Sequence, residues 1–281
     1  MKTVFVYNPK SGSALSKSEL EKLTTNAGVE IDMWLPITAQ FSKKLAALCK
    51  EPIRVLAYGG DGTISSTAGL LADTSSVLVP LPGGTLNHFS KDLGVPQDIE
   101  TALNELHSWT QRKIDIASVN NHYFINNSSI GVYARSLDTR DRLSGKVAKW
   151  PAAVWATLKE IVQFRTYKIQ LNDRWHRTPL MFVGNNHYSL SSGTIGVRHK
   201  VNAGKLSIYI AKASSRLAML GIGIGLLVGR RADLIEEKRV ESTIRFKNKQ
   251  VIVSVDGEKI HMTTPLTYRI HPGTLNVLAP K

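Results

Sequence analysis

Short apolar runs alternate with amphipathic segments along the first part of the chain. Apolar runs of about four to eight residues bounded by glycine or proline are typical of buried strands, and apolar residues three or four positions apart are typical of helices. We expect strands at residues 3–7, 31–35, 53–58 and 77–81, and helices at 15–23, 39–49 and 64–71. Strands that alternate with helices predict an α/β layer with a mostly parallel sheet.

The pattern changes after Ile114, where short β-rich runs are divided by turn signals such as Asn120-Asn121. These runs lie at residues 116–119, 123–125, 168–171, 180–183, 206–210, 243–246 and 251–255, with helical insertions expected at 146–164 and 216–229. The pattern predicts a second, largely antiparallel β domain. A substrate is expected in the cleft between the two domains.

Composition narrows the class of protein. Among 281 residues, 42% are hydrophobic and 21% are charged, which is typical of a packed globular chain. Cys49 is the single cysteine, so no intramolecular disulfide forms, in keeping with a reducing compartment. The longest apolar stretch, residues 217–228, is shorter than the roughly 20 residues of a bilayer span. We therefore expect a soluble, cytoplasmic protein.

The net charge of +14 favours a polyanionic partner such as an anionic lipid surface or nucleotide phosphates. The basic residues occur in scattered pairs such as Lys43-Lys44, without a long basic run or an aromatic platform. The sequence therefore predicts no nucleic-acid module. The apolar stretch 217–228 has basic residues at both ends, and we interpret it as a core helix in preference to a membrane-seated one.

The sharpest motif is Gly59-Gly60-Asp61-Gly62-Thr63, directly after an expected strand. Glycines let the backbone approach a ligand and direct N–H groups at phosphate oxygens, and the following helix dipole favours an anion. Asp61 suits such a loop if Mg²⁺ lies between its carboxylate and the phosphates. The alternative is an ordinary Gly-Asp-Gly turn.

Two more polar loops follow other strands of the same expected sheet. They are Asn8-Pro9-Lys10-Ser11-Gly12 and Pro82-Gly83-Gly84-Thr85-Leu86-Asn87. Because ligands of parallel sheets bind at the carboxyl ends of strands, all three loops are expected at one site. Neither loop has the P-loop pattern, and no GxGxxG follows the first strand, so a Walker-type NTPase or a Rossmann dehydrogenase is not predicted.

A pair of acids follows the run 251–255. Asp256-Gly257 is a turn signal, so Asp256 and Glu258 are expected at the end of a strand. Both acids are therefore candidate site residues. The alternative is a plain hairpin with solvated acids.

Together these motifs resemble the diacylglycerol kinase catalytic-domain family, and most of all its bacterial lipid-kinase branch. Further matches continue in the expected order as Lys91-Asp92-Leu93-Gly94-Val95-Pro96, Asn127-Ser128-Ser129-Ile130-Gly131, Val183-Gly184-Asn185 and Asp256-Gly257-Glu258. Sphingosine and ceramide kinases are similar, and NAD kinases share the Gly-Gly-Asp-Gly-Thr loop.

The resemblance implies an α/β plus β fold. An N-terminal α/β ATP-binding domain with a parallel sheet, as in NAD and diacylglycerol kinases, is expected at 1–115 with about 266–281. A C-terminal antiparallel, β-sandwich-like lipid-substrate domain is expected at 116–265. The implied ATP contacts are Asn8, Ser11, Gly12, Thr38, Gly59, Gly60, Asp61, Gly62, Thr63, Ser65, Gly84, Thr85 and Asn87. Mg²⁺ is implied at Asp61, and catalysis by Glu258, Asp256 and Asp61.

The implied function is an ATP-dependent lipid kinase that phosphorylates the hydroxyl of a diacylglycerol-like lipid and acts at the inner membrane face. Other hydroxyl acceptors (a polyprenol, a sphingoid base or NAD) and a non-catalytic nucleotide- or membrane-binding module remain alternatives. One stretch departs from the family, since Lys200-Val201-Asn202-Ala203-Gly204-Lys205-Leu206 lacks both acids of the pattern Asp-x-x-Asp-Gly-x-Leu. We therefore expect no second, structural Mg²⁺ there.

Overall fold

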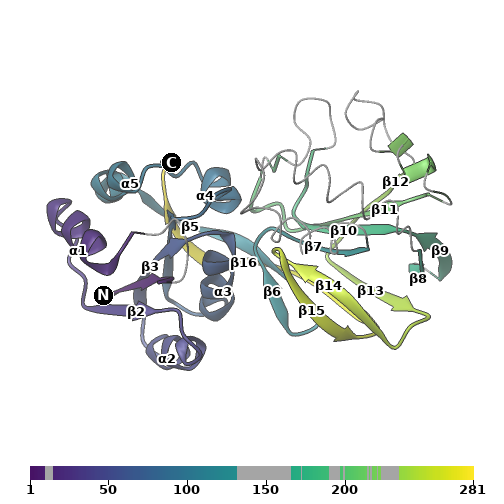
Figure 1. Cartoon of the computed structure of the whole chain (residues 1–281), viewed down its shortest axis with the longest axis horizontal. Helices are drawn as coiled ribbons and strands as arrows, with labels where there is room; N and C mark the ends of the chain where they lie inside the picture. The colour runs from purple at the N-terminus through teal and green to yellow at the C-terminus, as the bar shows by residue number, and fades with distance from the viewer. Residues whose placement is uncertain are drawn as a thin grey trace.

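The chain forms two lobes that lie side by side (Figure 1). The computed structural model describes residues 1–9, 15–131, 166–171, 173–189, 197–198, 200–213, 215, 217–219, 221–222 and 234–281. We call the lobe at the left of Figure 1, which contains the N-terminus, the α/β lobe, and the other the β lobe. Each lobe has its own hydrophobic core.

The α/β lobe is built on a parallel sheet. Its strands are β1 (Lys2–Tyr7), β2 (Met33–Pro36), β3 (Ile53–Gly59) and β4 (Val77–Pro82), in the order β2-β1-β3-β4. Neighbouring strands pair in parallel throughout this order. Every residue of β4 is buried, as expected for a strand that is covered on both faces. The predicted parallel sheet is therefore confirmed.

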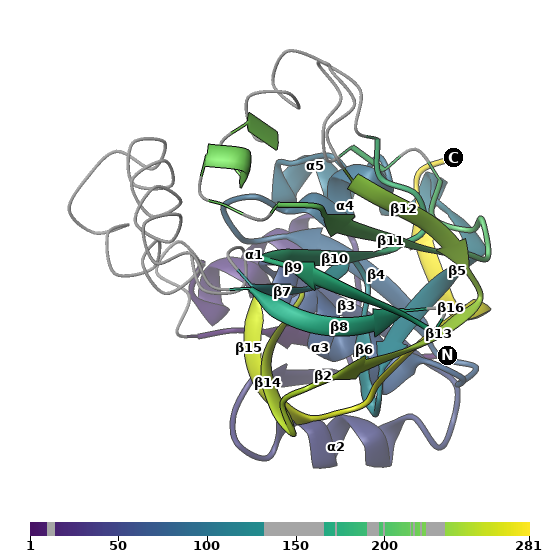
Figure 2. The ribbon, with the colours of Figure 1, turned by 90° about the vertical axis from the view of Figure 1, so that its right-hand side faces the viewer.

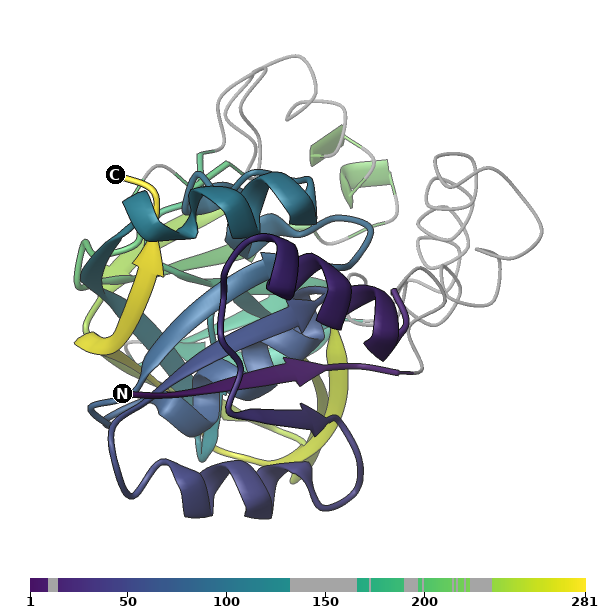
Figure 3. The ribbon, with the colours of Figure 1, turned by 90° about the vertical axis from the view of Figure 1, so that its left-hand side faces the viewer.

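Helices cover both faces of this sheet (Figure 3). On one face lie α1 (Lys17–Asn26) and α5 (Ile99–Glu105), and on the other lie α2 (Phe41–Leu48) and α3 (Asp61–Leu71). A capping box begins α1, because Ser16 and Glu19 satisfy each other's backbone amides. The helix α5 and two short helical turns, α4 (His88–Asp92) and η1 (Leu106–Ser108), were not predicted.

Two long strands connect the lobes. The strand β5 (Thr110–Val119) pairs antiparallel with β16 (Leu266–Ala279), and β16 pairs parallel with β4 near its own end. The last residues of β16 thus lie in the α/β lobe, beside β4. A register shift between His271 and Leu275 divides β16. The division explains why the sequence shows no single strand pattern there.

The first sheet continues from β16 into the β lobe. It runs on through β13 (Glu241–Phe246), β8 (Tyr167–Leu171) and β9 (Arg174–Thr178), while β6 (His122–Phe124) pairs with β5. The core changes from the first lobe to the second between Ile116 and Ala117 of β5. The expected domain boundaries stay a prediction, because β5 and β16 run through both lobes.

A second, entirely antiparallel sheet completes the β lobe (Figure 2). In the described residues its strands are β7 (Asn127–Gly131), β10 (Leu180–Asn185), β11 (Leu206–Ala211), β12 (Leu234–Arg239), β14 (Gln250–Val255) and β15 (Glu258–Thr263). Their order is β12-β11-β10-β7-β14-β15. The antiparallel prediction is confirmed, although polar strands such as β12 were missed because they lack an apolar run.

Two predicted helices fall largely outside the described residues. The insertion expected at 146–164 lies entirely outside them, and of the one at 216–229 only 217–219 and 221–222 are described, as helix. Within the described residues, the helices are too short or too polar to cross a bilayer.

Candidate functional site

The predicted nucleotide loops meet at one edge of the parallel sheet. Asn8 follows β1 and Thr38 lies two residues beyond β2, while Gly59 and Pro82 are the last residues of β3 and β4. Because these four strands are neighbours and parallel, their carboxyl ends lie side by side. Ser11 and Gly12 lie outside the described residues.

Two glycine-bearing loops touch backbone to backbone at this edge. Gly83 donates its N–H to the carbonyl of Gly59 at 3.0 Å. A Cβ atom at Gly84 would lie 2.4 Å from the Cα of Gly60, which no side chain tolerates. From the sequence, these glycines were expected to let a ligand approach the backbone. The structure shows that they also let the loop at Gly83-Gly84 pack directly on the loop at Gly59-Gly60.

Asn87 holds the shape of the second loop. Its backbone is left-handed with φ of 50°, and its side-chain amide accepts from the N–H of Gly84 at 2.9 Å and donates to the Gly84 carbonyl at 3.1 Å. Asparagine tolerates this conformation better than most residues. Thr85, between the two, is exposed. Two hydrogen bonds therefore hold the base of the loop, and Thr85 lies on its exposed part.

The first turn of α3 offers free backbone donors. Gly60 is the N-cap residue and has no side chain to cap the helix, and the first intrahelical bond runs from Ile64 to the Gly60 carbonyl. The N–H groups of Asp61, Gly62 and Thr63 therefore have no partner within the helix. Unpaired donors at the positive end of a helix suit a phosphate group.

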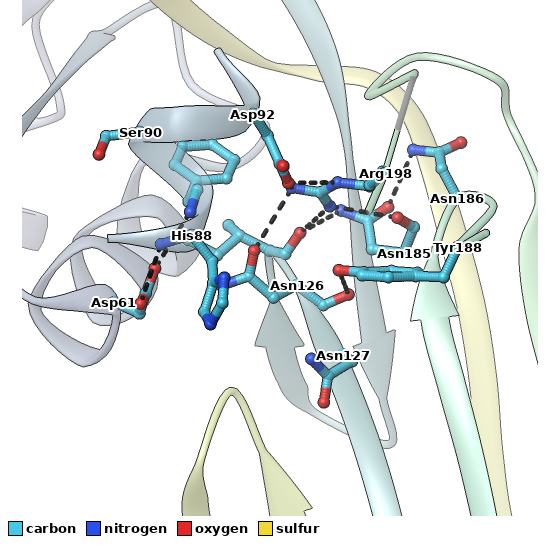
Figure 4. Close-up of polar contacts among 12 residues, drawn as sticks. Asp61, His88, Ser90, Asp92, Asn126, Asn127, Asn185, Asn186, Tyr188 and Arg198 are labelled. Carbon is cyan, nitrogen blue, oxygen red and sulfur yellow. Dashed lines mark hydrogen bonds and ion pairs between the residues drawn. The ribbon is translucent and has the colours of Figure 1, made fainter. Parts of the chain in front are cut away.

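Asp61 connects the first glycine loop to the start of α4, directly after the second (Figure 4). Its carboxylate accepts from the backbone N–H of His88 at 3.2 Å and of Phe89 at 3.1 Å, which begin α4. A carboxylate has about four acceptor positions, so two contacts leave room for a cation. Within the described part of the chain, no group of three or more His, Cys, Asp or Glu side chains could hold a metal. Any Mg²⁺ at Asp61 would therefore depend on oxygens from phosphates and water as well.

The acids of the β lobe lie on a two-residue hairpin between β14 and β15. Asp256 and Gly257 have φ of 47° and 91°, positive values that a tight hairpin turn requires, so the predicted turn is confirmed. The residue Asp256 is partly exposed at the turn, but its carboxylate is enclosed by four donors. These are the Ser65 hydroxyl at 2.5 Å and the N–H groups of Ile125, Asn126 and Asn127 at 2.7–2.9 Å.

Burial raises the pKa of Asp256, while the hydrogen bonds from Ser65 and the three amides act in the opposite direction. The carboxylate thus fastens the hairpin both to α3 and to the start of β7. Ser65, implied as an ATP contact, directs its hydroxyl at Asp256. The catalytic role of Asp256 stays a prediction.

Glu258, in contrast, is exposed and lies against the first turn of α3. A Cβ atom at Gly62 would stand 3.3 Å from the Glu258 Oε1. Among the described residues, the Glu258 side chain makes no ion pair or hydrogen bond, so its carboxylate oxygens are open to a ligand. The structure brings the first glycine loop and the acidic hairpin together, across a separation of almost 200 positions in the sequence.

Arg198 is a buried cation near the site that was not predicted from the sequence (Figure 4). Its side chain has no exposed surface and pairs with Asp92, the last residue of α4, at 2.7 Å. It also donates to the carbonyls of Ile125 and Asn185 and to the Asn126 side chain. Burial raises the pKa of Asp92, and Arg198 counteracts part of that rise. Asp92 belongs to the motif of residues 91–96 that resembles the kinase family. The residues around Arg198 form no motif, so nothing in the sequence indicates that Arg198 is buried.

The stretch 200–206 is held by side chains of the protein. Asp115 accepts from the N–H of Gly204 at 2.7 Å and of Gly273 at 3.0 Å, and Asn186 accepts from that of Ala203 at 2.9 Å. These bonds hold a turn that lacks the two acidic residues of the family pattern Asp-x-x-Asp-Gly-x-Leu. The expectation that no second Mg²⁺ binds there stays a prediction.

Comparison with known proteins agrees with this fold and these motifs. Residues 2–119 match the family model of the diacylglycerol kinase catalytic domain. The chain is 37% identical to a diacylglycerol kinase of Bacillus subtilis over 130 residues, which are 43% of each chain. It is 31% identical to a diacylglycerol kinase of Staphylococcus aureus over 156 residues, 50% of this chain and 48% of the relative. The predicted resemblance to this family is confirmed. The matches span less than half the length of these curated relatives.

Similarity of fold extends over the whole chain. A crystal structure from Bacillus anthracis has a TM-score of 0.74 at 25% identity and covers 99% of this chain and 97% of its own. A diacylglycerol kinase from the same organism has a TM-score of 0.68 at 22% identity, covering 99% and 96%. The chain therefore has a diacylglycerol kinase-like fold, and the expected α/β plus β class is confirmed.

Proposed function

We propose that the protein is an ATP-dependent lipid kinase that transfers the γ-phosphate of ATP to the hydroxyl of diacylglycerol or a similar lipid, giving a phosphatidate-type product. One observation carries the proposal. The exposed carboxylate of Glu258 lies against the uncapped first turn of α3, 3.3 Å from the Cβ position of Gly62. A proton acceptor thus stands beside backbone donors that suit a phosphate.

In this proposal the edge of the parallel sheet binds the nucleotide. The amides of residues 61–63 hold phosphate oxygens, and Thr85 contributes an exposed hydroxyl. Asn8 and Thr38, at the ends of the next two strands, extend the site away from the transferred phosphate. Asp61 would hold Mg²⁺, which when bound neutralises phosphate charge. Its two backbone contacts keep the carboxylate fixed in position.

The chemical step belongs to Glu258. It accepts the proton of the lipid hydroxyl while the hydroxyl oxygen forms a bond to the γ-phosphorus and the bond from that phosphorus to the β-γ bridging oxygen breaks, releasing ADP. Asp256 fastens the hairpin to α3 through Ser65 and to the start of β7 through three amides, and so sets where Glu258 stands.

The acceptor and the membrane belong to the same proposal. A diacylglycerol resides in a bilayer, and the net charge of +14 attracts the protein to anionic lipid headgroups. We infer a peripheral contact with the cytoplasmic face of the membrane, with no nucleic acid as partner.

A panel of acceptors with radiolabelled ATP tests the proposal. Diacylglycerol, a sphingoid base and a polyprenol are dispersed in anionic vesicles, NAD is supplied in solution, and Glu258→Gln serves as the inactive control. We expect label in a phosphatidate-type product with wild-type protein and Mg²⁺. Preferential labelling of another acceptor would replace diacylglycerol as substrate. Nucleotide binding without labelling of any acceptor would reject the kinase.

A further inference from the structure

A ring of hydrogen bonds, closed by short segments of the chain, passes through the start of α3. From Asp61 it passes to the first amides of α4, and from Asp92 at the end of α4 to Arg198. From Arg198 it passes to the carbonyl of Ile125 and the side chain of Asn126. The amides of 125–127 then contact Asp256, which returns to α3 through Ser65. Two carboxylates thus hold backbone amides on either side of one helix.

Arg198 is the point at which the ring crosses between lobes through a buried charge. Asp92 belongs to the α/β lobe, and the other three acceptors of Arg198 lie at or near the start of β7 and the end of β10. The guanidinium also lies over the rings of Phe89 and Tyr188, at 5.9 and 5.7 Å from their centroids. A planar group with five donors satisfies several acceptors at once, which an ammonium group cannot do.

We propose that Arg198 is a positioning residue that sets the distance between Glu258 and the phosphate-binding turn of α3. It acts through Asp92 and α4 on Asp61 at one side, and through 125–127 and Asp256 on the hairpin at the other. Glu258 itself makes no contact that would hold it, in the described residues, so its place depends on the turn that precedes it. This inference rests on the proposed function for its link to catalysis.

Arg198→Lys tests the ring while it keeps the buried charge beside Asp92. Lysine can pair with Asp92 but cannot reach all the carbonyl and amide acceptors together. We expect a cooperatively folded protein in which kcat falls by about 10- to 100-fold, because small displacements of reacting groups have costs of this order. The ATP dissociation constant should stay within about threefold of the wild-type value, because the amides of α3 are unchanged. Arg269→Lys, in an exposed pair with Glu241, is the matched control.

Hydrogen–deuterium exchange tests the ring without any substrate. In Arg198→Lys, the amides of 88–89 and 125–127 should exchange faster than in wild type, while those of β1 and β3 should not change. If Arg198→Lys fails to fold, Asp92→Asn removes the same ion pair with less change of shape and takes its place.

The outcomes are separable. A folded variant with wild-type kcat overturns the positioning role, and so does a loss of kcat that only follows the folded fraction. Unchanged exchange at 88–89 and 125–127 overturns the ring itself. A wild-type protein that phosphorylates no acceptor rejects the proposed function, and the exchange measurement still decides whether the ring exists.

Discussion

The hydroxyl of Ser65 donates a 2.5 Å hydrogen bond to the carboxylate of Asp256, although 191 positions separate them in the chain. Ser65 lies on the second turn of α3, and Asp256 on the hairpin that carries Glu258. The bond therefore fixes the acidic hairpin to the helix whose first turn offers free amides.

Ser65→Ala removes one of the four donors to Asp256. Hydrogen bonds to charged groups contribute about 1.5–3 kcal/mol, so we expect a loss of this order in the free energy of unfolding, together with a lower kcat. Denaturant unfolding and turnover of the same preparation measure both. Ser66→Ala is the matched control, because that side chain is exposed and bonds only to a carbonyl of its own helix. Equal stability of the two variants would contradict the role of Ser65.

Glu258→Gln removes the proposed proton acceptor and keeps the size of the side chain. A positioned base contributes about 10²–10⁴-fold, so the barrier should rise by about 3–5 kcal/mol. ATP should bind no more weakly than to wild type, because a negative charge beside the phosphate turn has been removed. Turnover with dispersed diacylglycerol and ATP affinity by calorimetry provide the measurements. Retained turnover, or parallel losses of affinity and turnover, would remove Glu258 from the mechanism; Glu100→Gln, on exposed α5 surface, is the control.

Asp61→Asn replaces a charged acceptor by an amide whose NH₂ group cannot accept the N–H of α4. We expect turnover to fall by about 100-fold or more, with a weaker dependence on Mg²⁺ concentration. Asp32→Asn is a suitable control, since Asp32 also accepts a backbone N–H, from Thr3 at 2.6 Å, away from the site. A Mg²⁺ titration of both variants makes the comparison, and near-normal activity of Asp61→Asn would exclude Asp61 as the metal residue.

Gly84→Ala introduces a Cβ that would stand 2.4 Å from the Cα of Gly60. The two loops must separate, which costs about 1–3 kcal/mol for an overpacked contact and displaces the phosphate turn. We expect lower stability and weaker ATP binding, measured by thermal unfolding and calorimetry. Gly221→Ala is the control, because a Cβ there meets no atom within 4 Å. Unchanged ATP affinity in Gly84→Ala would show that loop packing does not shape the site.

The environment of His271 should make the stability of the fold depend on pH. Burial lowers its pKa, with Asp73 acting against this and Arg269 adding to it, and its Nε2 lies 2.9 Å from the Ser118 hydroxyl. Between the lowered folded-state pKa and the unfolded-state value of about 6.5, the unfolded chain binds more protons than the folded one, so stability falls as the pH falls through this window. His271→Gln should lose less stability between pH 8 and pH 5 than wild type. Denaturant unfolding across this range checks it, with exposed His122→Gln as control.

Local signals in the sequence were sufficient for most of the architecture. Apolar runs that end at glycine or proline located β1, β3 and β4, and the turn pair Asp256-Gly257 located the β14–β15 hairpin. These signals depend on neighbours in the chain, since strand burial and turn conformation follow from residue type and short-range spacing. Polar or divided strands such as β12 and β16 were missed for the same reason, because their apolar positions are few or shift register.

The same distinction between local signals and distant contacts applies to the candidate site. Residue types and order along the chain were enough to indicate glycine loops at the strand ends and acids on a turn. Whether those acids are free or engaged depends on partners almost 200 positions away, which no local pattern encodes. Only the folded chain shows that Asp256 is enclosed by Ser65 and three amides while Glu258 is exposed beside Gly62. The burial of Arg198 between lobes is of the same kind, because a charge can be buried only where distant acceptors converge on it.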